Sequence, residues 1–497
     1  MRILFEKHSP DIAPEVLGSQ GLTSVETALK APAGYVPLPT LQTADGPTTG
    51  ITLGAGVDEV RAAMYCMGSG WVNANYAVTN TNVYWSYGTG AWTSITGAYP
   101  GTTNNEVVNC CQFGDAFIFV YGLVDGSTAI PQRSNVTTHS ACADLSATTP
   151  EASYVMAVGQ HVVLGDFWDG TYGIGQANNG VWWSAIGNHT SWPDPTSAAG
   201  IAAQSGYIEL SGSGGPITAL VSDGDVGHIF QQTAIWRMDY VGGAVMFEID
   251  NVVTGKGAVT PNMAAKTPIG IVFIDRSGWN LYDGQSTRPI GGQAFNKSFM
   301  EDEFTTRWNN LQRYDRWSLV ADPESSRVYC HYAKGAGSGD NNRLAIWDWQ
   351  RDEIVYDDVA ASKVVTLLSD PDDAAAGVAP KIGIFNGADP ERFQCWDGVA
   401  QLATFITGDI EPNPGGRATF TSAKPLVQGV GATVKLYVSA RDDLGDAVTY
   451  GSAKTVNSWD RFDGEEDARY FRFKLTCEST WTACTGMDAD FAPSGRV

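Results

Sequence analysis

The stretch "IWRMDYVGGAVMFEID", residues 235–250, decides the fold. The apolar residues that alternate with polar ones are Trp236, Met238 and Tyr240 before the glycine pair and Val245, Phe247 and Ile249 after it. Alternation with a period of two places apolar side chains on one face of a strand. Because Gly-Gly between two such runs is typical of a hairpin turn, the stretch predicts two antiparallel strands.

Hairpins of the same kind recur on both sides of this stretch. The strand-and-turn runs are "DAFIFVYG" (115–122), the hairpin "YVMAVGQHVVLGDFWDG" (154–170), the three-strand meander at 268–292 and a further meander at 316–358. Only "NKSFMEDEFTTRWNNLQ" (296–312) has helical spacing, and we expect a short connector there. The middle of the chain is therefore predicted to be all-β.

An aromatic-Asp-Gly turn ends a predicted strand at three places, Trp168-Asp169-Gly170, Tyr282-Asp283-Gly284 and Trp396-Asp397-Gly398. Successive turns are 114 residues apart. A four-stranded propeller blade takes about 40–50 residues, so each interval has room for two to three blades. Short strands with recurring aromatic motifs favour a β-propeller of six to eight blades over residues 51–407. A pair of β-sandwiches is the alternative.

The two ends of the chain differ from this middle part. Residues 1–50 are rich in Pro, Gly and Thr, which indicates an extended N-terminal arm with one turn of helix near "SVETALKA", residues 24–31. Such an arm lies either on another subunit or on its own domain. The Pro/Gly-rich "GDIEPNPGG" (408–416) opens a C-terminal unit, residues 408–497. Strict alternation in "TVKLYVS" (433–439) and "YFRFKLT" (470–476) predicts a small antiparallel β-sandwich there.

Charge is unevenly distributed. The formal net charge is −23, and residues 51–408 carry 18 basic and 36 acidic side chains. Tight wrapping by DNA needs a basic surface, so it is disfavoured. An acidic surface that lets DNA slide and simple solubility both remain open. Neither a secretory signal nor about 18 consecutive apolar residues is present, so we expect no membrane span.

The residues that usually carry metal or covalent chemistry are scattered. The eight cysteines form no CxxC pair, which suits a reducing, cytosolic origin. Cys477 and Cys484 are close enough in sequence to meet across a hairpin, and a disulfide between them is left open. The six histidines include no HExxH motif, and no GxSxG elbow occurs. We therefore expect no metal, no cofactor and no catalytic residue.

A pair of carboxylates is the remaining catalytic option, because glycoside hydrolysis needs only two. Acidic clusters occur at "EDE" (301–303), "YDD" (356–358) and "SDPDD" (369–373). Such clusters are usually solvated loops, and the last lacks EF-hand spacing. No residue of these clusters can be nominated as a catalytic acid.

Several segments together resemble the tail-hub, or nozzle, proteins of short-tailed bacteriophages, also called tail tubular or packaged-DNA stabilisation proteins. The segments are "GLTSVETALKAPAGYVPLPTLQ" (21–42), "NNGVWWSAIGNHTSWPD" (178–194), "VGHIFQQTAIWRMDYVGGAVMFEIDNVVTGKGAVTP" (226–261), "YFRFKLT" (470–476) and "GMDADFAPSGRV" (486–497). Their order in one chain carries the resemblance, although the chain lacks a long inserted tip domain.

The resemblance implies a structural protein of the virion, assembled in the host cytoplasm, and not an enzyme. It implies a homohexameric ring below the portal and head-to-tail adaptor, near tail fibres, spikes or a needle, which retains packaged DNA and conducts double-stranded DNA during ejection. An acidic wall would avoid trapping phosphates. The candidate channel-lining residues are Glu301, Asp302, Glu303, Asp357, Asp358, Asp370, Asp372 and Asp373. A propeller glycosidase or depolymerase and a carbohydrate-binding adhesin are the alternatives.

Overall fold

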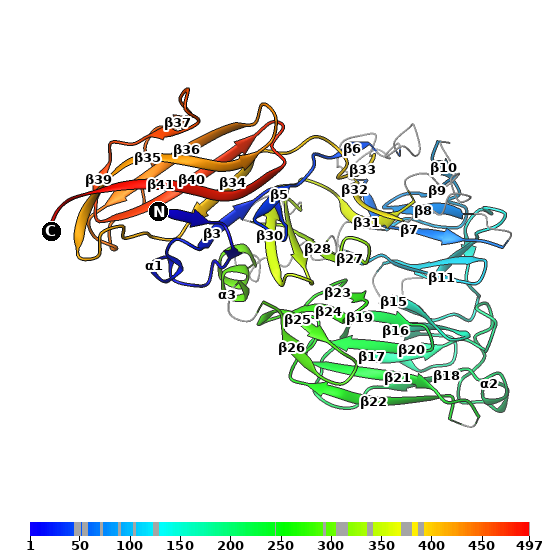
Figure 1. Ribbon diagram of the computed structural model, residues 1–497. Coiled ribbons are helices and arrows are strands. Elements are labelled where there is room, and N and C mark those ends of the chain that lie inside the picture. Colours follow the sequence, from blue (N-terminus) through cyan, green and yellow to red (C-terminus); the bar gives the residue numbers. More distant parts are fainter. Residues whose placement is uncertain are drawn as a thin grey trace.

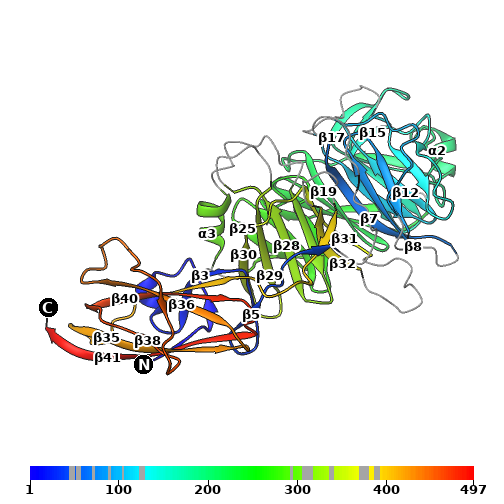
Figure 2. The same cartoon turned by 90° about the horizontal axis from the view of Figure 1, so that it is seen from above.

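The structure is a computed structural model. It describes residues 1–43, 51, 58–69, 73–87, 91–102, 106–122, 129–243, 245–291, 295–304, 317–334, 341–368, 380–385 and 392–496, without the side chains of 43, 302–304 and 496. Two β units lie side by side in this part of the chain, a propeller and a sandwich (Figures 1 and 2). The predicted all-β class with a propeller and a C-terminal sandwich is confirmed.

Seven four-stranded units form the propeller in the described residues. From the inside outward, the first three blades are β7 (Val60–Met67), β8 (Asn73–Thr79), β9 (Val83–Ser86) and β10 (Thr93–Ser94); β11 (Asn109–Phe113), β12 (Ala116–Val120), β13 (Gln132–Asn135) and β14 (Ala143–Asp144); and β15 (Glu151–Val158), β16 (His161–Asp169), β17 (Gly175–Trp183) and β18 (Gly206–Glu209). Each is an antiparallel meander, so its strands pair with their neighbours in sequence.

The next three blades follow the same order. They are β19 (Ile217–Asp223), β20 (Val226–Gln231), β21 (Ala234–Tyr240) and β22 (Phe247–Thr254); β23 (Ala264–Thr267), β24 (Gly270–Asp275), β25 (Gly278–Tyr282) and β26 (Thr287–Pro289); and β27 (Ser318–Asp322), β28 (Arg327–Tyr332), β29 (Arg343–Asp348) and β30 (Glu353–Asp357). The last blade combines β31 (Lys363–Leu367), β32 (Lys381–Phe385) and β33 (Phe393–Cys395) with β6 (Gln42–Thr43).

The ring of blades is closed. The innermost strand of each blade contacts that of the next, and β31 contacts β7. The N-terminal β6 supplies the outer strand of the last blade, and the Asn75 amide bonds both backbone groups of Leu368 at 2.8 and 3.0 Å to join the first and last blades. Six blades are separate sheets, whereas β27–β30 continue into a sheet of the sandwich. Closure selects the propeller over the alternative of two sandwiches.

Residues 235–250 form the predicted hairpin. Strands β21 and β22 pair with Tyr240 opposite Phe247. Gly242 and Gly243 in the turn have φ values of 71° and 76°, a region that glycine enters without the steric cost of a Cβ atom. The spacing of the three aromatic-Asp-Gly turns, however, marks no common blade position: the first follows a second strand, β16, and the others follow third strands, β25 and β33.

The sandwich is built from both ends of the chain. One sheet contains β4 (Ala28–Lys30), β5 (Tyr35–Pro37), β41 (Ala483–Arg496), β35 (Gly416–Gln428) and β38 (Phe462–Asp463), with β1 (Arg2–Leu4) and β39 (Asp467–Ala468) at its sides. The other contains β3 (Gly21–Glu26), β34 (Ala403–Thr407), β40 (Tyr470–Glu478), β36 (Thr433–Arg441) and β37 (Lys454–Thr455), with β2 (Lys7–His8) beside β3. The N-terminal segment is therefore extended and pairs within its own chain.

The turn of helix expected near residues 24–31 is wrong. Residues 21–26 and 28–30 are strands β3 and β4, and β3 pairs with β34. β-branched Thr23 and Val25 favour a strand, and the partner strand that satisfies their backbone lies almost 400 residues away in the sequence, from 403 to 407. The helical elements described are α1 (Pro14–Leu17), α2 (Ala198–Ala202), α3 (Asn296–Ser298) and the π-helical turn η1 (Phe299–Phe304).

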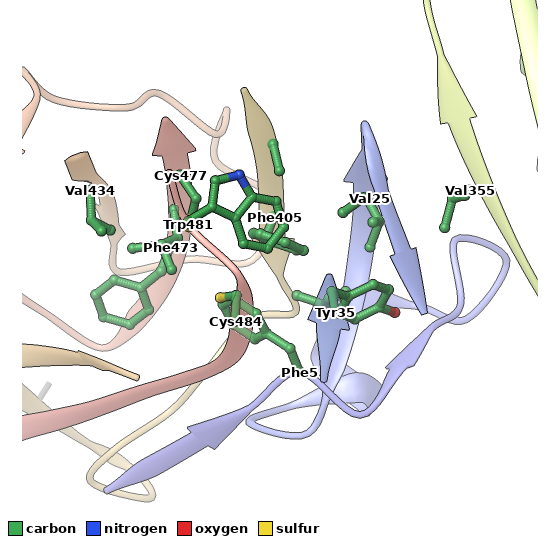
Figure 3. Close-up of a cluster of buried hydrophobic side chains, with 14 of the residues drawn as sticks. Phe5, Val25, Tyr35, Val355, Phe405, Val434, Phe473, Cys477, Trp481 and Cys484 are labelled. Atoms are coloured by element: carbon green, nitrogen blue, oxygen red, sulfur yellow. The ribbon is translucent and has the colours of Figure 1, made fainter. Parts of the chain in front are cut away.

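One hydrophobic cluster joins the two units. Phe5 and Tyr35 from the N-terminal segment pack on Phe405 with ring centroids 5.1 and 5.4 Å apart, and Trp481 meets the same ring at 6.1 Å (Figure 3). The cluster extends into the propeller through buried residues such as Val355. Because the two units share one core and one continuous sheet, they form a single block.

Candidate functional site

The axis of the propeller holds a cavity of about 550 Å³. Strands β7, β11, β27 and β31 line it, together with Asn262 before β23. Small and apolar residues, among them Ala62, Ala63 and Val364, make up much of the wall. Longer side chains, among them Met64 and Tyr65 of β7, complete the lining.

Polar contacts at this axis tie blades together. The Asn109 side-chain amide donates to Asn262 Oδ1 at 2.7 Å, which links β11 to the segment before β23. Lys363 is buried, and its Nζ donates to the Trp317 carbonyl at 3.2 Å. Lys363 is the charged residue among those lining the cavity, and no carboxylate lines it within the described part of the chain. The cavity therefore lacks the carboxylate pair that glycoside hydrolysis requires.

Cys110 also lines the cavity, but its environment suppresses nucleophilic chemistry. Burial raises the pKa of the Cys110 thiol to about 12, and nearby Lys363 opposes that shift. The thiolate is the nucleophilic form of cysteine, so this shift disfavours nucleophilic attack by Cys110 near neutral pH. Every cysteine of the chain is free, including Cys477 and Cys484, which form no disulfide.

The predicted channel-lining acids lie in different places. Glu301 is exposed in η1 and pairs weakly with Lys297, Nζ to Oε2 3.9 Å. Asp358 is 82 % exposed and accepts from Arg343 at 2.8 Å. The structure gives no side-chain placement for Asp302 and Glu303, and Asp370, Asp372 and Asp373 lie outside the described residues. For all of these residues, lining a channel stays a prediction.

Asp357 departs from the expected exposure, although lining a channel stays a prediction for it as for the other acidic residues. Its side chain is 2 % exposed where β30 meets the sandwich. Burial, with a contribution from neighbouring Asp358, raises the pKa of the Asp357 carboxyl to about 6, while Gln401 and Arg343 oppose the shift. Period-two alternation could not reveal this burial, because β30 is covered on its far side by the N-terminal segment.

A polar network fixes that junction. Arg343 forms a bidentate pair with Glu26, with N–O distances of 2.8 and 2.9 Å. Glu353 accepts from the His8 backbone N–H at 2.7 Å and from the Tyr35 hydroxyl, and Lys30 Nζ lies 3.7 Å from its other oxygen. These contacts join blade strands to residues more than 300 positions away, so the sequence carried no signal for them.

Histidine and metal chemistry receive no support from the geometry. In the described part of the chain no three His, Cys, Asp or Glu residues lie close enough to hold a metal ion. His331 is enclosed between the Val359 carbonyl and the Asn341 amide, and burial lowers its pKa to about 4. No helix among the described residues has the length and apolar character needed to span a membrane.

Comparison with known proteins gives limited similarity. No protein-family description and no curated protein matches the chain. Among solved structures, the virginiamycin B lyase of Staphylococcus aureus is 10 % identical, with 72 % of this chain and 98 % of that chain covered and a TM-score of 0.37. A quinoprotein alcohol dehydrogenase-like protein of Bacteroides thetaiotaomicron is 12 % identical, with 65 % and 76 % covered and a TM-score of 0.36. Similarity at this level carries no functional argument.

Proposed function

We propose that this chain is a structural protein of a bacteriophage tail, a hub or nozzle below the portal and adaptor that retains packaged DNA and conducts it during ejection. The observation that carries the proposal is the single block formed by propeller and sandwich. Their shared core contains residues of the first 38 positions, of the sandwich and of two blades. A tube wall under load needs subunits without an internal hinge, and a continuous sheet supplies that stiffness.

The axis of each propeller is not the conduit in this proposal. A cavity of about 550 Å³ has the size of a small-molecule site and is too small to admit a DNA duplex. DNA would instead pass through the lumen of a ring of copies, closed by heterologous contacts related by rotation. The excess of 36 acidic over 18 basic side chains in residues 51–408 would weaken adhesion of phosphates to the wall.

An exposed aromatic side chain supports self-association or docking within the tail. Trp459 is 80 % exposed at the tip of a loop of the sandwich. The Asn457 side chain accepts from the backbone N–H groups of Trp459 and Arg461 at 2.9 and 3.2 Å, so the backbone that carries the indole is held in a defined turn. Tryptophan is enriched at the centres of protein interfaces, where its large area is buried on binding.

Light scattering on the purified full-length chain tests the proposal. We expect a mass about six times that of the 53.1 kDa subunit and no release of reducing ends from bacterial surface glycans. A stable monomer that hydrolyses those glycans would overturn it in favour of a propeller glycosidase. A stable monomer without activity would also contradict the ring.

A further inference from the structure

A polar pocket of about 490 Å³ lies between the fourth and fifth blades, away from the axial cavity. The two blades are neighbours whose inner strands, β19 and β23, are in contact (Figure 1). The pocket opens beside the turns that follow these inner strands, where Asp223 ends β19 and Lys266 and Thr267 end β23. No part of the proposed function uses this site.

The pocket wall from the fourth blade presents a row of polar side chains. His228 in β20 stands directly opposite Arg237 in β21. His228 is 5 % exposed, lines the pocket, and its Nδ1 atom has no hydrogen-bond partner. A buried imidazole nitrogen without a partner lacks the hydrogen bond that water would give it. A bound ligand can supply that hydrogen bond if the His228 ring rotates toward it.

The charges around the pocket are already balanced by one another. Lys266 pairs with Asp223, and Arg237 Nε lies 2.8 Å from Asp239 Oδ2. Asp283 accepts from the backbone N–H groups of Gln285 and Ser286 at 3.0 and 2.8 Å. Burial lowers the pKa of His228 chiefly by desolvation, so the ring is neutral at pH 7. With two cations and two carboxylates on its lining, the pocket has no net charge to attract an ion.

The arrangement nevertheless offers donors and acceptors in close alternation. The ammonium of Lys266 and the guanidinium of Arg237 keep N–H groups beyond those used by one carboxylate partner, and Asp223 keeps lone pairs. Pro268 and the 39 % exposed Ile269 add an apolar surface beside these groups. Vicinal hydroxyl groups both donate and accept, and the C–H face of a sugar ring packs on apolar surface.

We propose that this inter-blade pocket binds a neutral saccharide of one or two rings. Its volume lies within the usual range for small-molecule sites, about 300–1,000 Å³. In a tail protein such a site would contact surface sugars, but the assignment rests on the pocket alone and holds whether or not the chain forms a ring.

Saturation-transfer NMR on the full-length chain tests the site with D-glucose, D-galactose, D-mannose, N-acetyl-D-glucosamine and lactose as probes. We expect saturable binding of at least one of them. The double variant Arg237→Ala/Lys266→Ala should weaken that binding by about tenfold or more, equivalent to one hydrogen-bonded contact or more. Both side chains are partly exposed, 39 % and 48 %, so the variant should fold, which its circular dichroism and melting curve check.

Lys381→Ala is the matched control. Its side chain is 44 % exposed and pairs with Asp397 at 2.7 Å, as Lys266 pairs with Asp223, but it lies in another blade. Saccharide binding should be unchanged in this variant. Absence of saturable binding by all five sugars, or equal binding by the folded double variant and the native protein, overturns the proposal. Tighter binding of glucose 6-phosphate than of glucose overturns it as well, because it would make the pocket an anion site.

Discussion

The propeller and the sandwich are both antiparallel, yet they are assembled in opposite ways. Each blade from the first to the sixth is a meander of strands adjacent in the sequence. The sandwich instead pairs β1 with β41, so that Arg2 stands opposite Asp488. Local pairing is encoded by the alternation and turns of one short stretch, whereas the sandwich needs both chain ends present. We therefore expect that changes in the contacts of the N-terminal segment destabilise the sandwich and the junction more than the propeller.

The largest effect should come from removing the aromatic centre of the sandwich. Trp481 is 1 % exposed, and its indole N–H donates to the Gln401 carbonyl at 2.9 Å. Trp481→Ala should lower the free energy of unfolding by about 3–5 kcal/mol, because it leaves a cavity and an unpaired carbonyl. Val430→Ala is the control, since that side chain lies in the same unit and is 95 % exposed. Denaturant unfolding followed by fluorescence measures both, and equal midpoints would refute the shared core.

A smaller loss is expected at the junction. Glu353→Gln keeps the shape of the acceptor for His8 and Tyr35 but removes the charge that faces Lys30, whose side chain is 12 % exposed. We expect the free energy of unfolding to fall by about 2–3 kcal/mol. This is less than the effect of fully breaking a buried ion pair, because Lys30 also donates to the Phe5 carbonyl. Hydrogen exchange should accelerate in β1–β5 and not in β11–β14. Uniform acceleration across both units would contradict the comparison.

The pH dependence sharpens the comparison between junction and propeller. Burial raises the pKa of Asp357 to about 6 and that of Asp166, in the third blade, to about 6 as well. A carboxyl whose folded pKa is raised favours folding most below its unfolded value, about 3.9, and this contribution is lost as pH rises through about 6.

Because of Asp357, the native protein should lose on the order of 2 kcal/mol of unfolding free energy as the pH rises from 4 to 7, and Asp357→Asn should abolish that loss. Asp166→Asn should abolish a second, separate loss in the same direction. Melting curves of the two single variants and of the double variant at both pH values measure this. An unchanged pH profile in the Asp357 variant would show that the carboxyl is not buried in solution.

The smallest effect on the melting temperature is expected at Asp358. Asp358 is 82 % exposed, while its partner Arg343 is also held by Glu26. Asp358→Asn should leave the melting temperature unchanged within error, because exposed ion pairs contribute little. Glu26→Gln, which loosens the bidentate partner, should lower it measurably in the same assay. A larger fall in melting temperature for Asp358→Asn than for Glu26→Gln would mean that Asp358, and not Glu26, is the main partner of Arg343.

Sequence patterns could predict the blades because hairpin signals are local. The stretch at 235–250 gave its strands and turn correctly, and alternation in 433–439 and 470–476 gave the paired strands β36 and β40. They could not predict that residues 21–26 form a strand of the sandwich, because its partner is remote. They likewise missed the axial cavity and the inter-blade pocket, whose walls combine residues from separate blades and depend on register and blade order.

Electron microscopy of the purified, full-length chain tests the central claim most directly. The claim is that propeller and sandwich act as one stiff block and that six such blocks close into a tube. We expect class averages of a closed sixfold ring with an open lumen wide enough for duplex DNA, in which each subunit shows both units in one fixed relation. Isolated subunits, or subunits whose sandwich takes many angles to its propeller, would contradict it.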